Sequence, residues 1–168
     1  MNESDSLDSS EPPKVGDCAP DFVLPTSNDE EVHLMDMLDN SVVLVFFSET
    51  FTLYSSGQAK VFTRLCESLS NIGITFLGIA TEPVATLKTF IEEMDIPFLM
   101  ASDFDRVVSK AYGVYASEIG GLKFVARPSI FVIDRKGVID YVCIVEGEQS
   151  LPDPDEIAEQ IIKSRMDE

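Results

Sequence analysis

The stretch from Val42 to Gln58 reads VVLVFFSETFTLYSSGQ and predicts a strand that leads through a loop into a helix. Its first six residues, up to Phe47, are all apolar, which is typical of a strand buried on both faces of a parallel sheet. Beyond the polar loop, apolar residues recur at helical spacing and predict a helix over about 56–70. These helical positions are Val61, Phe62, Leu65, Cys66 and Leu69.

The rest of the chain alternates strand and helix patterns around this unit, which favours an α/β fold. Upstream, a short strand lies between Pro20 and Pro25, and a second is Val32 to Leu34. Downstream, we expect strands at 74–80, 97–100 and 128–133 and helices at 84–94 and 106–112. The turn 134–137 then predicts an antiparallel hairpin with a strand over 138–145. A last helix follows, with Asp153 as its cap and Pro154 in its first turn.

Length and composition predict one soluble domain. The 168 residues are 45% apolar, enough for one sizeable core over residues 14–168. Residues 1–13 are polar and acidic and end at Pro12 and Pro13, so we interpret them as a flexible tail. No apolar run is long enough for a membrane span, and no secretion signal opens the chain, so we expect a cytoplasmic protein without a membrane partner.

The charge balance argues against nucleic acid as a partner. Thirty acidic against twelve basic residues give a formal net charge of −18, which would repel a phosphate backbone. Two interpretations of the acidity stay open, adaptation to high salt and simple solubility. The three cysteines, Cys18, Cys66 and Cys143, lack metal-ligand spacing, and we expect neither a metal nor a cofactor.

Several motifs resemble the peroxiredoxin family, the alkyl hydroperoxide reductase and thiol-specific antioxidant superfamily, and its bacterioferritin-comigratory or one-cysteine-like branch in particular. They are Val15 to Pro25 (VGDCAPDFVLP), Ser48 to Ser55 (SETFTLYS), Ser102 to Phe104 with Ala111 to Val114 (SDF, AYGV) and Arg127 to Asp134 (RPSIFVID). The resemblance implies a thioredoxin-like fold of the peroxiredoxin type, a central mixed sheet flanked by helices. It also implies an antioxidant oxidoreductase that reduces hydroperoxides with a thioredoxin-like reductant, works without a cofactor and forms a homodimer.

The resemblance places Ser55 where the family has its peroxidatic cysteine. Thr52 would orient the peroxide, and Arg127 would supply the fixed positive charge of the pocket. A serine hydroxyl has no route to a sulfenic acid, so the chain as written is expected to lack peroxidase activity. Cys66 cannot deputise, because it follows Ser55 by eleven residues, some 16 Å along the helix. We interpret all three cysteines as packing residues.

Three alternatives stay open at this point. The serine is either a natural loss or a Cys→Ser variant of an active peroxidase, and departures at Ser48, Leu53, Tyr54 and Gln58 favour natural loss. In the second alternative, the chain is a non-enzymatic module that binds a protein or holds a small anion at Thr52, Ser55 and Arg127. In the third, Arg127 only pairs with a carboxylate such as that of Glu49. Serine hydrolysis is disfavoured, since the single histidine, His33, lies in an exposed strand.

Overall fold

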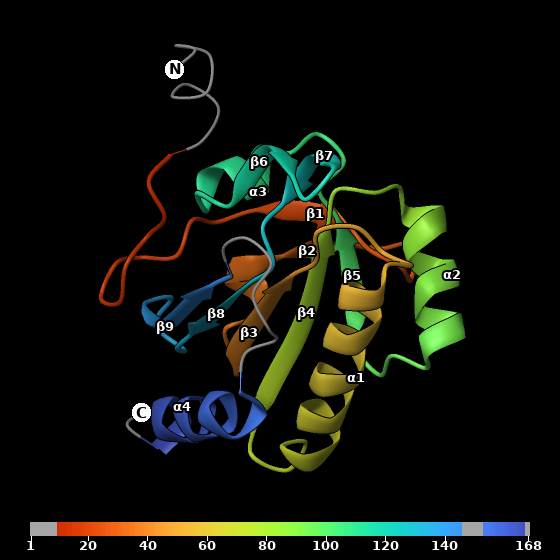
Figure 1. Cartoon of the computed structure of the whole chain (residues 1–168). Helices are drawn as coiled ribbons and strands as arrows, with labels where there is room; N and C mark the ends of the chain where they lie inside the picture. Colours follow the sequence, from red (N-terminus) through yellow and green to blue (C-terminus); the bar gives the residue numbers. More distant parts are fainter. Residues whose placement is uncertain (1–9, 146–152, 167–168) are drawn as a thin grey trace.

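A five-stranded mixed sheet forms the centre of the computed structural model, which describes residues 10–145 and 153–166 (Figure 1). The strands, in their order across the sheet, are β5 (Leu99–Ser102), β4 (Ile74–Ala80), β3 (Ser41–Phe46), β8 (Ser129–Ile133) and β9 (Ile139–Ile144). β3, β4 and β5 run parallel, whereas β8 pairs antiparallel with both β3 and β9. All six side chains of β3 are buried, as an apolar run at the centre of a sheet requires. The predicted mixed sheet is confirmed.

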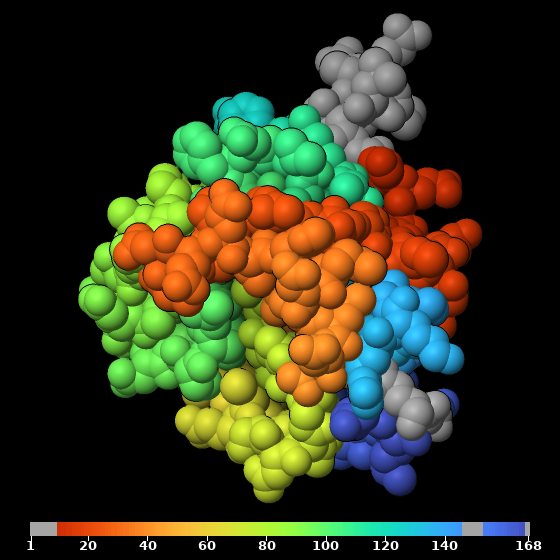
Figure 2. Space-filling model, turned by 180° about the vertical axis from the view of Figure 1, so that it is seen from behind, coloured from red at the N-terminus to blue at the C-terminus, as the bar shows by residue number. Residues whose placement is uncertain are grey.

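Helices α1 (Leu53–Ser68), α2 (Val84–Met94) and α4 (Pro154–Met166) pack on one face of the sheet (Figure 1). Their apolar sides share one core with alternate residues of β3 and β8, such as Val43, Val45 and Ile130. The other face is covered by four smaller elements, seen from behind in Figure 2. These are β1 (Val23–Pro25), β2 (Glu31–His33), the 3-10 helix η1 (Leu34–Met37) and α3 (Val107–Ala111).

The sequence patterns located most elements to within three residues. The predicted bounds of β4 and α2 match residue for residue, and Asp153 accepts a hydrogen bond from the main chain of Asp155, at 3.0 Å, at the start of α4. α1 begins three residues earlier than periodicity indicates, because Thr52 caps it there. Leu34 was expected to end the second strand but opens η1 instead.

A second hairpin was not predicted from the sequence. β6 (Tyr115–Ile119) and β7 (Leu122–Ala126) form a separate two-stranded sheet that stands beside α3 in Figure 1. Gly120 and Gly121 join them with φ of 54° and 85°, the left-handed values that a two-residue hairpin turn needs. A Gly-Gly pair between alternating residues is a hairpin signal, so this element was detectable.

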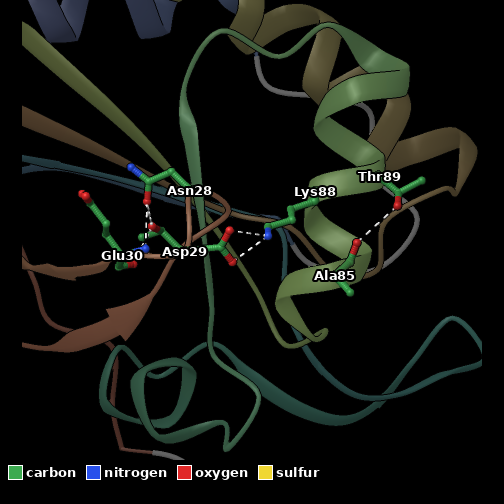
Figure 3. Close-up of polar contacts among 7 residues, drawn as sticks. Asn28, Asp29, Glu30, Ala85, Lys88 and Thr89 are labelled. Carbon is green, nitrogen blue, oxygen red and sulfur yellow. Dashed lines mark hydrogen bonds and ion pairs between the residues drawn. The ribbon is translucent and has the colours of Figure 1, made fainter.

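A surface ion pair fixes the β1–β2 turn against α2 (Figure 3). The ammonium of Lys88 lies 2.6 Å from both carboxylate oxygens of Asp29, which has a left-handed φ of 66°. Within the turn, the Asn28 side chain accepts the main-chain N–H of Glu30 at 3.2 Å. The contact therefore joins the two faces of the sheet around the β5 edge.

Residues 10–13 lie against the end of α3. The Ser10 N–H donates to the Lys110 carbonyl at 3.2 Å, and a Cβ added at Gly113 would collide with the main chain of Pro12. The predicted flexible tail falls mostly on residues 1–9, which lie outside the described residues, so the boundary at 13/14 stays a prediction. None of the described helices is both long and apolar enough for a membrane span.

Candidate active site

Thr52 and Ser55 form a reciprocal cap at the start of α1. The Thr52 hydroxyl accepts the Ser55 N–H at 3.1 Å, and the Ser55 hydroxyl accepts the Thr52 N–H at 3.1 Å. The two hydroxyl oxygens are 2.9 Å apart, and Ser55 Oγ also lies 3.2 Å from the Thr52 carbonyl. This is the capping box, which satisfies N–H groups that the first turn of a helix leaves unpaired. The structure thus brings these two predicted site residues together.

The first two turns of α1 are anchored to the end of β3. Ser55 is fully buried, and Gln58, one turn later, donates from its amide to the Phe46 carbonyl at 3.1 Å. Among the described residues, the amide oxygen of Gln58 has no hydrogen-bond partner, although the residue is only 2% exposed. The helix start is therefore held in place from inside the protein.

Glu82 clamps the loop that precedes α1. One of its carboxylate oxygens accepts the Thr50 N–H at 2.5 Å, and the other accepts the Thr50 hydroxyl at 2.6 Å. Phe51 then adopts a left-handed φ of 64° and packs edge-on against Phe90, with ring centroids 5.2 Å apart. Such a φ is unusual for a bulky residue and persists only where neighbours hold it. The bonds at Thr50 and the ring contact supply that hold.

Arg127 is bonded to the β6 strand and the residue before it. Its guanidinium donates to the Tyr115 carbonyl at 3.0 Å, and its own N–H donates to the Val114 carbonyl at 2.7 Å. Among the described residues, no hydrogen bond joins it to Thr52 or Ser55 and no ion pair joins it to Glu49. The alternative in which Arg127 pairs with Glu49 therefore finds no support among the described residues, and the guanidinium is held by the β6–β7 hairpin.

The cysteines lie in three different settings. Cys66 packs against the core between the sheet and the helices, and burial raises the pKa of its thiol, which confirms a packing role. Cys143 is partly buried on β9 against the same core. Cys18 is exposed, so the prediction that it packs in the interior is wrong; its segment runs along the outside of the fold and bridges Val138.

Cys143 lies beside the candidate site, which the sequence did not show. Burial, with the nearby Cys143 sulfur as a second cause, raises the pKa of both Tyr54 and Tyr141. Tyr54 belongs to the first turn of α1, and its buried hydroxyl has no hydrogen-bond partner in the part of the chain that the structure describes. Only the pairing of β9 with β8 puts the thiol there, and no sequence motif announces that contact.

A cavity of about 500 Å³ lies between the β1–β2 turn and α2, away from these residues, and is lined in part by Asn28, Lys88 and Glu92. Figure 3 shows two of these residues, Asn28 and Lys88. Thr52, Ser55 and Arg127 do not line it, and its lysine is already paired with Asp29. In the described part of the chain, no group of three or more His, Cys, Asp or Glu residues could hold a metal ion.

His33 is engaged away from Ser55. Its Nε2 lies 2.6 Å from the Asp21 carboxylate, and its Nδ1 lies 3.7 Å from that of Asp36. The hydrogen bond to Asp21 raises the pKa of His33 above 6.5. A histidine bonded in this way is not placed as a base for Ser55, in line with the sequence argument against hydrolysis.

We expect the pKa of His33 to fall when Asp21 is replaced by asparagine. Because the pKa of His33 is raised in the folded state, its contact with Asp21 stabilises the fold fully below the unfolded pKa of 6.5. This stabilisation is lost as the pH rises through the folded pKa. As the only histidine, His33 gives one imidazole signal to follow by NMR titration. Asp39→Asn is the matched control, and an unchanged pKa in Asp21→Asn would contradict the contact.

Comparisons with known proteins identify the family. The family model described as AhpC/TSA family matches residues 15–142. A protein named putative peroxiredoxin bcp from Coxiella burnetii is 33% identical over 131 residues, covering 77% of this chain and 87% of that protein.

Solved structures show the same fold. Peroxidoxin BcpB from Mycobacterium tuberculosis has a TM-score of 0.76 at 26% identity, covering 92% of this chain and 97% of its own. A Cys→Ser mutant of PrxQ from Xylella fastidiosa has a TM-score of 0.80 at 21% identity, covering 92% and 98%, and supports the fold alone. The thioredoxin-like fold is confirmed, and the chain belongs to the AhpC/TSA family of peroxiredoxins.

Proposed function

We propose that this chain is a peroxiredoxin-family protein without peroxidase activity of its own, because Ser55 stands at the position of the peroxidatic cysteine. The observation that carries the proposal is the capping box, in which the Ser55 hydroxyl is fully buried and bonded to Thr52. In the capping box the serine hydroxyl accepts the Thr52 N–H, which is a structural role that a hydroxyl oxygen can fill.

The chemistry explains why the substitution matters. In a thiol peroxidase a thiolate sulfur attacks the O–O bond, becomes a sulfenic acid and releases water or an alcohol, and a thiol reductant then restores it. A serine oxygen cannot take that step. Burial raises the pKa of the Cys66 thiol, which disfavours the reactive thiolate, and Cys143 is partly buried against the core.

The direct test is peroxide consumption by the unmodified chain with a dithiol reductant and thioredoxin. We expect no consumption above that of a variant with all three cysteines replaced by serine, because no cysteine takes part in the capping box of Thr52 and Ser55. Turnover that is lost when Ser55 alone is changed to alanine would overturn the proposal.

An anion site is the second candidate, favoured by one observation. α1 spans sixteen residues and has no acidic residue in its first turn, so the positive end of its dipole is not offset there. Against it, Thr52 already accepts one of the first N–H groups. Melting curves in phosphate and in chloride at equal ionic strength separate the two candidates. A phosphate-specific rise that Arg127→Gln removes would establish the anion site, and equal curves would exclude it.

A further inference from the structure

An apolar groove opens between β1 and the start of α3, on the face seen in Figure 2. Its volume is about 370 Å³. The buried part of its lining comprises the apolar residues Phe22, Leu24 and Val108 and the polar residues Ser102 and Asp103. Three further apolar side chains line it while more than half exposed, namely Val23 at 52%, Phe104 at 54% and Val107 at 66%. A concentration of half-exposed apolar side chains around a hollow is typical of an interaction site.

The groove exists because two chain segments diverge. Thr26 forms a β-bridge with Ala101 of β5, and the Ser27 N–H donates to the Met100 carbonyl at 2.9 Å. Beyond this point β5 ends and the chain turns into α3, where the buried carboxylate of Asp103 accepts the N–H groups of Val108 and Ser109. The β1 edge is thereby left without a neighbouring strand beside the groove.

The open edge of β1 offers a main-chain donor and acceptor. The Leu34 N–H donates to the Phe22 carbonyl, and the Thr26 N–H donates to the Glu30 carbonyl, so alternate residues of β1 face β2. Val23 lies between them, and its N–H and carbonyl point away from β2. Within the described residues, no main-chain hydrogen bond from a loop and no isolated β-bridge reaches Val23 on that side. An extended segment can add to such an edge.

The charges around the groove are mainly negative. The exposed carboxylates of Asp21 and Asp105 line it, in a chain whose formal net charge is −18. Two basic side chains beside the groove are already engaged: His33 is bonded to Asp21, and Arg106 donates to the Phe124 and Phe104 carbonyls and lies 5.4 Å over the Phe104 ring. A second copy of this acidic chain would be repelled, whereas a basic segment would be attracted.

We propose that this groove binds an extended, basic segment of a partner protein, which pairs with the β1 edge at Val23. An apolar side chain of the segment fills the groove between Val23 and Val107. Flanking lysine or arginine side chains meet Asp21 and Asp105. Apolar fit and main-chain pairing give specificity, and the charges mainly speed association.

The probe is a fluorescent peptide, Lys-Leu-Lys-Leu-Lys, titrated with the full chain and followed by anisotropy. We expect it to bind at least about tenfold more tightly than Lys-Gly-Lys-Gly-Lys, which has the same charge but no apolar side chains. Methylating the main-chain nitrogen of one leucine or, separately, of the central lysine should weaken binding unequally, because neighbouring residues of an extended segment point their N–H groups to opposite sides and only one of the two faces the β1 edge. Equal affinity of the leucine and glycine peptides would overturn the proposal, since it would show attraction by charge alone.

The matched protein variants are Val107→Arg in the groove and Met166→Arg at the exposed end of α4. Both replace an exposed apolar residue with arginine and change the net charge equally. We expect Val107→Arg to weaken peptide binding about tenfold and Met166→Arg less than about twofold. Equal weakening by both variants would overturn the proposal. So would a dimer of the unmodified chain in sedimentation that Val107→Arg abolishes, because a second copy would then be the occupant.

Discussion

Tyr112→Ala is expected to lower the free energy of unfolding by about 4 kcal/mol, the usual range for removing a large buried aromatic side chain. Tyr112 is fully buried at the end of α3, and its ring packs within 5.0 to 6.3 Å of the rings of Phe131, Phe46 and Phe22. Its hydroxyl donates to the Pro20 carbonyl at 2.7 Å. The side chain therefore joins three segments that are distant in sequence, and a domain stable by about 5–15 kcal/mol loses a large part of that margin.

The effect should reach the candidate site through Phe46. The ring of Phe46 packs on Tyr112 at one face of the sheet, and its carbonyl accepts the Gln58 amide at the start of α1. We therefore expect faster amide exchange in the first turn of α1 as well as a lower urea midpoint. Tyr112→Phe, which only leaves the Pro20 carbonyl unpaired, should cost about 1–2 kcal/mol. Equal losses in the two variants would contradict a role for ring packing.

Local patterns predicted the elements because each was set by neighbouring residues. The apolar run of β3, the helical spacing in α2 and the Asp153 cap are readable within a few positions of the chain. β6 and β7 were missed although Gly120 and Gly121 mark their turn, because the two strands lie between the family motifs that end at Val114 and begin at Arg127. The predicted helix started three residues later than α1 for another reason. Leu53, the first residue of α1, is almost fully exposed and does not belong to the apolar pattern of the helix.

The candidate site was only partly predictable, because its contacts join distant segments. Thr52 and Ser55 are three residues apart, so the sequence could place them together. The bonds from Thr50 to Glu82, from Arg127 to Tyr115 and from Gln58 to Phe46 depend on how the strands pair. Tertiary pairing also puts Cys143 beside Tyr54. The roles of Thr52, Ser55 and Arg127 in any chemistry stay a prediction.

Ser55→Cys is expected to give the chain a thiol that hydrogen peroxide oxidises to a sulfenic acid. The new sulfur would occupy the third residue of a sixteen-residue helix with no acidic residue in its first turn. A helix N-terminus lowers a cysteine pKa, and a shift from about 8.5 to about 7 raises the thiolate fraction at pH 7 about 15-fold. The Thr52 hydroxyl is in place to bond the thiolate or the peroxide. We expect oxidation at least about 15-fold faster than that of the native cysteines.

Ser56→Cys is the matched control, because residue 56 shares the helix end and bonds the Thr52 carbonyl through its main chain but, among the described residues, forms no hydrogen bond with the Thr52 hydroxyl. Trapping of sulfenic acid, followed by mass spectrometry over a range of peroxide concentrations, gives the rate at each position. If both variants react alike, the Thr52 hydroxyl contributes nothing to the rate of oxidation, and the helix end alone sets that rate. If Ser55→Cys is slow and adding Ser48→Pro and Gln58→Glu makes it fast, the loop has diverged beyond the one missing sulfur. A fast reaction of Ser55→Cys alone means that the pocket is intact and that only the attacking atom is absent.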